Sequence, residues 1–260
     1  MILDDICATK AKEVAAAKRA RPIHELEERI AAKRKPRDFR QALREPGISL
    51  IAEIKKASPV KGVFLENLDP VELAALYEQA GARAISVLTD EQYFKGSLQD
   101  LVTVRQHVKV PCLRKEFIVD PYQIYEARAA GADAFLLIVR ILSDDQLKEF
   151  LDAGEELGMA ALVETYDAAE IERALVVGAH IIGINNRNLD TFEVNINTTL
   201  ELKKRVPGGN VLVSESGIQT REHVRRLEDG GVDAILVGEA LVTSNDIAAK
   251  VHELLGTNAR

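Results

Sequence analysis

From residue 49 onward the chain alternates short apolar runs with helical patterns, and this alternation restricts the fold more than any other feature. The predicted strands are residues 49–55, 83–89, 110–115, 133–139, 159–164, 180–185, 210–215 and 232–237. The predicted helices that follow them are residues 70–80, 97–107, 121–130, 144–157, 167–177, 198–205, 219–229 and 246–255. Repeated strand–helix units build a parallel sheet, and strands that are apolar throughout must be covered on both faces. Eight units therefore predict an α/β fold, a closed (β/α)8 TIM barrel.

Four glycines form a weak internal repeat that supports the barrel. Gly81, Gly131, Gly178 and Gly231 each stand between a predicted helix end and a predicted strand start, where a left-handed residue ends the helix. They precede alternate strands, so the repeat is a pair of strand–helix units, and no solenoid signature accompanies it. The alternative is an open doubly wound sheet, but no Gly-x-Gly-x-x-Gly motif follows the first strand.

The first 47 residues are predicted to form a helical N-terminal extension. Their helical patterns cover residues 10–21, 23–32 and 37–44. The extension is too short to be a separate domain. We therefore expect a single domain of residues 1–260, in which residues 1–47 are the extension and residues 48–260 form the barrel.

Composition and charge exclude several classes of function. The net charge of −7 argues against bulk binding of nucleic acid, and the absence of tryptophan argues against a stacking platform for single strands. The two cysteines, Cys7 and Cys112, are far apart and predict free thiols in a reducing cytosol. No apolar run reaches the length of a membrane span, and the acidic residues after Met1 do not fit a signal peptide. We expect a cytoplasmic monomer without nucleic-acid or membrane partners.

Polar side chains gather at the carboxyl ends of the predicted strands, where barrel enzymes carry their chemistry. These residues are Glu53, Lys55, Thr89, Asp90, Arg114, Lys115, Glu164, Asn185, Asn186, Arg187, Glu215, Ser216 and Glu239. A network of structural ion pairs would also need charged residues, but it would not need them at one end only. The one-sided distribution therefore predicts an active site.

None of the five histidines falls at this end, so acid–base work must rest on lysine and glutamate. A lysine can serve if burial or a neighbouring cation lowers its pKa, and a glutamate can serve if burial raises its pKa. Each carboxylate at this end of the barrel has a side-chain cation nearby, so its negative charge is already balanced and the cluster does not suit Mg²⁺. We predict neither a metal nor a cofactor.

Glycines follow the seventh and eighth predicted strands, at Gly217 and Gly238. A lone glycine there would be explained as a tight turn. A matched pair, next to Ser216 and Glu239, indicates backbone N–H groups that approach a phosphate beside a helix N-terminus. The expected ligand is a phosphorylated small molecule.

Several linked motifs in this order resemble the signature of the indole-3-glycerol-phosphate synthase family. They are Ala52-Glu-Ile-Lys-Lys-Ala-Ser-Pro with Lys61-Gly62, Leu113-Arg-Lys-Glu-Phe with Asp120-Pro-Tyr-Gln-Ile, Leu162-Val-Glu-Thr, Gly183-Ile-Asn-Asn-Arg-Asn-Leu, Ser214-Glu-Ser-Gly-Ile and Val237-Gly-Glu-Ala-Leu. The resemblance covers nearly the whole chain, including the helical extension. It implies a carbon–carbon lyase of tryptophan biosynthesis that closes 1-(2-carboxyphenylamino)-1-deoxyribulose 5-phosphate to an indole, with loss of CO₂ and water.

The resemblance also implies roles for individual residues. Lys115 looks like the general acid and Glu164 like its acid–base partner. The resemblance implies that Lys55 and Arg187 hold the substrate carboxylate and that Glu53 holds the lysines in place. It implies that Asn185 and Glu215 orient the sugar hydroxyls and the ring nitrogen, with Ser58 and Ser216 as hydrogen-bond donors. The residues implied around the phosphate are Gly217, Gly238 and Glu239. Phe117 and Leu136 are candidates for an apolar floor under the aromatic ring, although core packing explains both equally well.

Two alternatives remain open. A Schiff-base aldolase acting on a sugar phosphate would need a buried lysine near other cations. A barrel that only binds a phosphorylated ligand would need the two glycines, but not Lys115 and Glu164 together. Both alternatives leave Arg187 unexplained.

Overall fold

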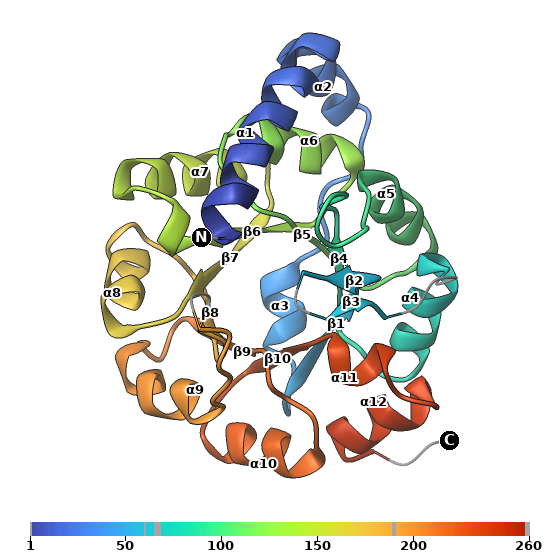
Figure 1. The fold of residues 1–260 in the computed structure, drawn as a ribbon, viewed down its shortest axis with the longest axis vertical. Coiled ribbons are helices and arrows are strands. Elements are labelled where there is room, and N and C mark those ends of the chain that lie inside the picture. The colour runs from blue at the N-terminus through green and yellow to red at the C-terminus, as the bar shows by residue number, and fades with distance from the viewer. Residues whose placement is uncertain (1, 60, 65–68, 189–190, 258–260) are drawn as a thin grey trace.

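The computed structural model describes residues 2–59, 61–64, 69–188 and 191–257. Eight parallel strands close into a barrel in the order β1-β10-β9-β8-β7-β6-β5-β4 (Figure 1). The strands are β1 (Ser49–Ile54), β4 (Ala84–Leu88), β5 (Cys112–Lys115), β6 (Ala134–Ile138), β7 (Ala160–Thr165), β8 (Ile181–Asn185), β9 (Val211–Glu215) and β10 (Ala234–Val237). Closure is made by β1, which pairs with β10 from Ser49↔Ala234 and with β4 from Ile51↔Ala84. The predicted (β/α)8 barrel is confirmed.

Helices surround the barrel between successive strands (Figure 1). They are α4 (Pro70–Gln79), α5 (Leu98–His107), α6 (Tyr122–Ala130), α7 (Asp144–Glu156), α8 (Ala168–Val176), α9 (Asn197–Leu202), α10 (Arg221–Asp229), α11 (Glu239–Val242) and α12 (Ile247–Leu255). Most begin at a side chain that accepts a hydrogen bond from the first turn, as Asp69, Ser97 and Thr220 do. Gly81, Gly131, Gly178 and Gly231 all have positive φ, between 78° and 109°, so the predicted helix-ending role of the repeat is confirmed.

Several details differ from the prediction. The loop after β1 carries a small antiparallel pair, β2 (Ala57–Ser58) and β3 (Gly62–Val63). The helix predicted to end at residue 205 ends at Leu202 and continues as a short 3-10 helix, Lys203–Arg205, while another 3-10 helix, Val139–Ile141, follows β6. The short helix α11 directly after β10 was not predicted.

The N-terminal extension runs along the barrel from one end to the other. It consists of α1 (Ile2–Ala20), α2 (Ile23–Ala31) and α3 (Phe39–Leu43), of which α1 is longer than the predicted pattern. Phe39 and Leu43 of α3 are fully buried in the same apolar cluster as the inward-facing residues of the strands, so α3 closes the end of the barrel where the strands begin. Figure 1 shows α3 inside the ring of strands. No helix in the described part of the chain is long and apolar enough to cross a membrane.

Candidate active site

A cavity of about 520 Å³ opens at the carboxyl ends of the strands, opposite α3. All twelve residues predicted for the site line it: Glu53, Lys55, Ser58, Lys115, Glu164, Asn185, Arg187, Glu215, Ser216, Gly217, Gly238 and Glu239. Phe117 and Leu136, the candidate floor residues, line it as well. The convergence at one end of the barrel is therefore confirmed, whereas the chemical role of each residue remains a prediction.

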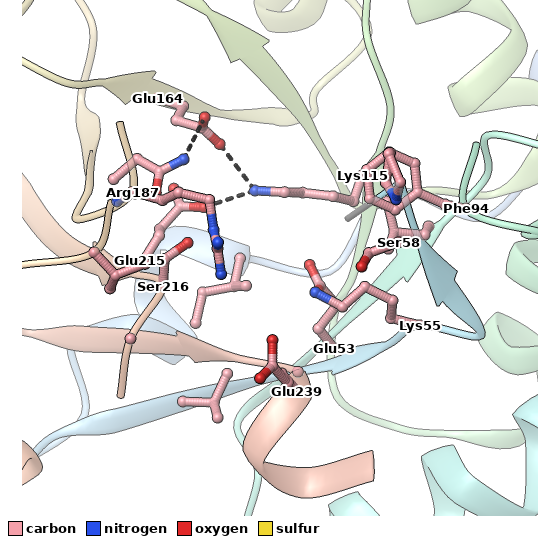
Figure 2. Close-up of a pocket in the computed structure, with 18 of the residues that line it drawn as sticks. Glu53, Lys55, Ser58, Phe94, Lys115, Glu164, Arg187, Glu215, Ser216 and Glu239 are labelled. Atoms are coloured by element: carbon pink, nitrogen blue, oxygen red, sulfur yellow. Dashed lines mark hydrogen bonds and ion pairs between the residues drawn. The ribbon is translucent and has the colours of Figure 1, made fainter. Parts of the chain in front are cut away.

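The centre of the cavity is a lysine held between two glutamates. Lys115 Nζ lies 3.0 Å from Glu164 Oε2 and 2.6 Å from Glu215 Oε2. Asn185 Nδ2 donates to the other oxygen of Glu164 at 2.9 Å. Figure 2 shows Lys115 pointing toward both carboxylates. The ammonium group therefore has two carboxylate partners, and Glu164 is fixed from both of its oxygens.

The barrel geometry explains why residues so distant in sequence meet here. Lys115, Glu164 and Glu215 belong to β5, β7 and β9, and Glu53 belongs to β1, which are alternate strands in the barrel order. Alternate strands of a (β/α)8 barrel point side chains into a common layer. The four charged groups therefore form one layer at the upper end of the interior, above the apolar layers.

Burial and charge set the protonation of this layer. Burial alone would lower the pKa of Lys115, but the carboxylates of Glu164, Glu215 and Glu53 outweigh it and raise that pKa above its ordinary value. The condition stated above, that burial or a neighbouring cation lowers the pKa of a working lysine, is not met at Lys115, because the neighbouring charges are anionic. Lys115 is protonated at neutral pH.

The two glutamates differ in protonation although both touch the same ammonium. Burial favours protonation of Glu164, but Lys115 and the hydrogen bond from Asn185 outweigh it and lower the pKa of Glu164. Burial dominates at Glu215 and, together with the charge of Glu164, raises its pKa to about 7. Two titratable groups whose environments push their pKa values apart are typical of an acid–base site. Glu164 is the carboxylate that stays ionised.

A second pair, Lys55 and Glu53, lies across the cavity. Lys55 Nζ is 2.9 Å from Glu53 Oε1, and it sits 6.0 Å from the ring centroid of Phe64. A β-carbon at Gly238 would come within 2.5 Å of Glu53 Oε1, so this glycine gives the carboxylate its space. Lys61 of the loop after β1 pairs with Glu239 at the start of α11, which joins two sides of the cavity mouth.

The turn after β9 has an unusual backbone conformation at the edge of the cavity. Ser216 and Gly217 both have positive φ, 69° and 78°, and a β-carbon at Gly217 would come within 2.4 Å of Val194 Cγ1. The buried amide of Asn186 fixes this turn, because its Nδ2 donates to Ser216 O and to Ser214 Oγ, both at 3.0 Å. The two left-handed residues turn the chain sharply beside the cavity, which both of them line. The glycine after β10, Gly238, precedes the first turn of α11 on the neighbouring strand.

Sequence reasoning missed part of the cavity lining. Ile2, Leu3 and Ile6 from the first turns of α1 line it, and so do Phe94 and Phe192. Apolar residues carry no chemical signature, and only the path of α1 over the mouth of the barrel brings its first turns here. Arg187 was predicted. Its backbone N–H donates to Asn185 Oδ1 at 3.0 Å, and its guanidinium contacts Phe192 O at 3.4 Å.

The fold and the site define a class of protein: a (β/α)8 barrel with a buried lysine held between two glutamates in a cavity at the carboxyl ends of its strands. Comparison with known sequences identifies the family within this class. The sequence model of the indole-3-glycerol phosphate synthase family matches residues 3–254. The chain belongs to the indole-3-glycerol phosphate synthase family, a family of carboxy-lyases in tryptophan biosynthesis that act on a phosphorylated small molecule.

Individual relatives agree with this assignment. The chain is 48% identical over 259 residues to the indole-3-glycerol phosphate synthase of Dehalococcoides mccartyi (strain CBDB1), covering 98% of this chain and 100% of the relative. It is 52% identical over 236 residues to that of Aquifex aeolicus (strain VF5), covering 90% of this chain and 91% of the relative. The family predicted from the sequence motifs is confirmed.

Solved structures of more distant proteins share the barrel. A 3-hexulose-6-phosphate synthase has a TM-score of 0.65 at 16% identity, covering 82% of this chain and 100% of its own. A thiamine phosphate pyrophosphorylase from Pyrococcus furiosus has a TM-score of 0.61 at 17% identity, covering 80% and 93%. At these identities the likeness is one of fold alone.

Proposed function

We propose that the cavity carries out the family's ring closure with Lys115 as the general acid. The aromatic carbon that bears the carboxylate attacks the ketone of 1-(2-carboxyphenylamino)-1-deoxyribulose 5-phosphate, and the ketone oxygen takes a proton as it becomes a hydroxyl. The observation that carries this proposal is the buried, protonated Lys115, 2.6 Å and 3.0 Å from two carboxylates that hold its Nζ in the cavity. A general acid must be protonated and positioned before the reaction begins.

Glu164 is the base of the later steps. After CO₂ has left, the new hydroxyl takes a second proton from Lys115, which has been reprotonated from solvent, and departs as water. A proton must then be removed from the carbon beside the nitrogen to complete the indole. Glu164 stays ionised because Lys115 and Asn185 lower its pKa, so it is ready to accept that proton. It touches the same ammonium group that donates the first proton, which lets one lysine–glutamate pair serve both steps.

The remaining cavity residues bind and orient the substrate. Lys55 and Arg187 hold the anthranilate carboxylate until it leaves, and the forked guanidinium suits a carboxylate well. Glu53 fixes Lys55 at 2.9 Å. The orienting groups are Asn185, Glu215 and Ser58, all of which line the cavity.

The phosphate lies at the turns after β9 and β10. Ser216 supplies a hydroxyl, and Gly217, Gly238 and Glu239 supply backbone N–H groups. The Glu239 carboxylate is paired with Lys61, which lowers its repulsion of a phosphate. The aromatic ring lies against the apolar side of the cavity, formed by Phe94, Phe117 and the first turns of α1. The reaction uses no metal or cofactor, and we propose that the protein works as a cytoplasmic monomer.

The geometry does not favour the aldolase alternative. A Schiff base requires a neutral amine, and an aldolase lysine is usually made neutral by neighbouring cations. Lys115 is surrounded by carboxylates that keep it charged.

The test is an assay with the purified protein and the carboxyphenylamino-deoxyribulose phosphate, followed by indole fluorescence without added metal or nucleotide. The proposal requires a rising indole signal and release of one CO₂ per indole. A folded protein that binds the substrate but gives neither product would contradict it. A covalent adduct of the substrate on Lys115 after borohydride reduction would support the aldolase reaction instead.

A further inference from the structure

A buried ammonium group connects α1 to the mouth of the barrel. Lys10 is only 2% exposed, although it lies on a helix outside the ring of strands. Its Nζ lies 2.7 Å from Asp90 Oδ2, 3.3 Å from Glu116 Oε1 and 2.8 Å from Glu13 Oε2. Asp90 and Glu116 are themselves buried, at 0% and 3% exposure. Buried charges are costly unless they pair closely, so a cluster of this kind is held together strongly.

The two buried carboxylates also hold the backbone of two loops at the cavity. Asp90 Oδ1 accepts hydrogen bonds from the N–H groups of Tyr93 at 2.6 Å and Phe94 at 3.0 Å. Glu116 Oε1 accepts from the N–H of Phe117 at 2.9 Å. The first loop follows β4 and the second follows β5. Asp90 and Glu116 thus each bind Lys10 and also hold the backbone of one loop.

The loops and α1 together form one side of the cavity, which we call the apolar wall. The apolar wall consists of Ile2, Leu3, Ile6, Phe94 and Phe117, all of which line the cavity. The rings of Phe94 and Phe117 lie 6.0 Å apart between centroids. Ile6 precedes Lys10 by one helical turn, so the residue that pairs with both loops also fixes the helix that supplies the rest of the wall.

We propose that Lys10 is a positioning residue that assembles the apolar wall by holding α1, the Phe94 loop and the Phe117 loop in register. The inference rests on the placement of the substrate's aromatic ring against this wall, given above. Lys10 itself is not one of the residues that line the cavity, and it acts through Asp90 and Glu116.

Removal of the ammonium would leave two buried carboxylates facing each other. Asp90 Oδ2 lies 2.7 Å from Lys10 Nζ, which is its charge partner. Another cation near Glu116 is Arg114, whose Nη2 is 3.9 Å away and is already paired with Glu126 at 2.7 Å. Repulsion and the entry of water would separate the loops. The wall would open, while Lys115 would keep its own partners, Glu164 and Glu215.

The test replaces Lys10 by methionine, which has a similar length and no charge. We expect KM for the carboxyphenylamino-deoxyribulose phosphate to rise about tenfold or more, and kcat to change by less than about threefold, because binding is lost rather than proton transfer. We also expect faster amide hydrogen exchange at Phe94 and Phe117, whose N–H groups are bound to Asp90 and Glu116. The exchange measurement does not require turnover. It therefore tests Lys10 even if the proposed reaction is wrong.

The matched control is Val14→Ala, one turn further along α1. Val14 is buried with Leu26 and Tyr122, away from the carboxylates, so its truncation loosens α1 without leaving an unpaired charge. The rise in KM of each variant is compared with its loss of melting temperature, so that a general loosening of α1 is separated from the loss of the ammonium group. A Lys10→Met protein with unchanged KM and unchanged exchange would overturn the proposal. So would a Val14→Ala protein with the same rise in KM, since Lys10 would then contribute only to stability.

A double variant tests the same proposal if Lys10→Met does not fold. Lys10→Met combined with Asp90→Asn removes one of the two opposed charges, and the amide introduced by the second substitution retains an oxygen for the N–H groups of Tyr93 and Phe94. We expect this double variant to fold with KM still raised by about threefold or more, because α1 is no longer tied to the loops. A KM equal to that of the unmodified protein would contradict the role of Lys10.

Discussion

The carboxylate of Glu215 lies directly against the backbone of Gly183. A β-carbon at residue 183 would come within 2.2 Å of Glu215 Oε1, a distance that no real contact shows. Gly183 lies in β8, between the strands that carry Glu164 and Glu215. The absence of a side chain at Gly183 thus leaves space for the Glu215 carboxylate beside Lys115.

Replacement of Gly183 by alanine should therefore displace Glu215 and disturb the centre of the site. We expect kcat to fall by about 100-fold, since a displacement of about 1 Å in a catalytic group has an effect of this size. Steady-state kinetics check this. Gly208→Ala is the control, because no atom lies within 4 Å of a β-carbon there and its activity should stay unchanged. Equal activity of Gly183→Ala and the unmodified protein would show that the position of Glu215 is not critical.

The pH dependence of kcat/KM should reveal Glu215. Its pKa is raised to about 7, so the side chain is ionised above that pH and protonated below it. Ionised Glu215 holds Lys115 in place, whereas protonated Glu215 holds it less strongly. We therefore expect kcat/KM to fall as the pH drops through about 7, and the transition to disappear in Glu215→Gln. Glu164 adds no transition in this range, because its pKa is lowered. A transition that persists in Glu215→Gln would assign it to another group.

Asn186 should control phosphate binding without touching the chemistry. It fixes the turn of Ser216 and Gly217 through its hydrogen bond to Ser216 O. We expect Asn186→Ala to weaken binding of inorganic phosphate by about tenfold, in line with a lost buried hydrogen bond of about 1–2 kcal/mol. Isothermal titration with phosphate measures this. The control is Asn197→Ala, whose side chain contacts Arg226 on the surface and should leave phosphate affinity unchanged. Equal phosphate affinity of the two variants would contradict the role of Asn186.

Asp133 should matter for stability rather than for activity. It is fully buried at the opposite end of the barrel, where it accepts from the N–H groups of Arg37 at 2.6 Å and Cys112 at 2.8 Å and pairs with Arg105. We expect Asp133→Asn to reduce the free energy of unfolding by about 3 kcal/mol, because one partner of a buried pair is lost. Denaturant unfolding tests this, with the exposed pair of Lys148 and Asp152 as reference: Asp152→Asn should cost less than about 1 kcal/mol. Similar losses in both variants would contradict the buried role.

Periodicity and turn chemistry made the barrel predictable. Eight apolar runs and the glycines that end helices, such as Gly131 and Gly231, carry local signals that tertiary structure did not override. The short pair β2 and β3 and the helix α11 were missed because each is too short to produce a period.

The site was predictable only in part. The fold class places Lys115, Glu164 and Glu215 at one end of the barrel, but only strand register shows that they touch and that anionic neighbours raise the pKa of Lys115. Lys10 shows the limit of sequence reasoning most clearly. A lysine in a charged helix is usually solvated, and only the path of α1 across the barrel mouth buries it between Asp90 and Glu116.

The most direct test of the account is the turnover of Lys115→Met, measured by indole fluorescence with the carboxyphenylamino-deoxyribulose phosphate as substrate. Lys12→Met, at an exposed lysine of α1, is the control. We expect the Lys115 variant to fold and bind the substrate, yet to lose about 1,000-fold or more in kcat, since no other group in the proposed mechanism supplies the first proton. A Lys115→Met protein that forms indole at a rate close to that of the control would contradict the proposed mechanism at its centre.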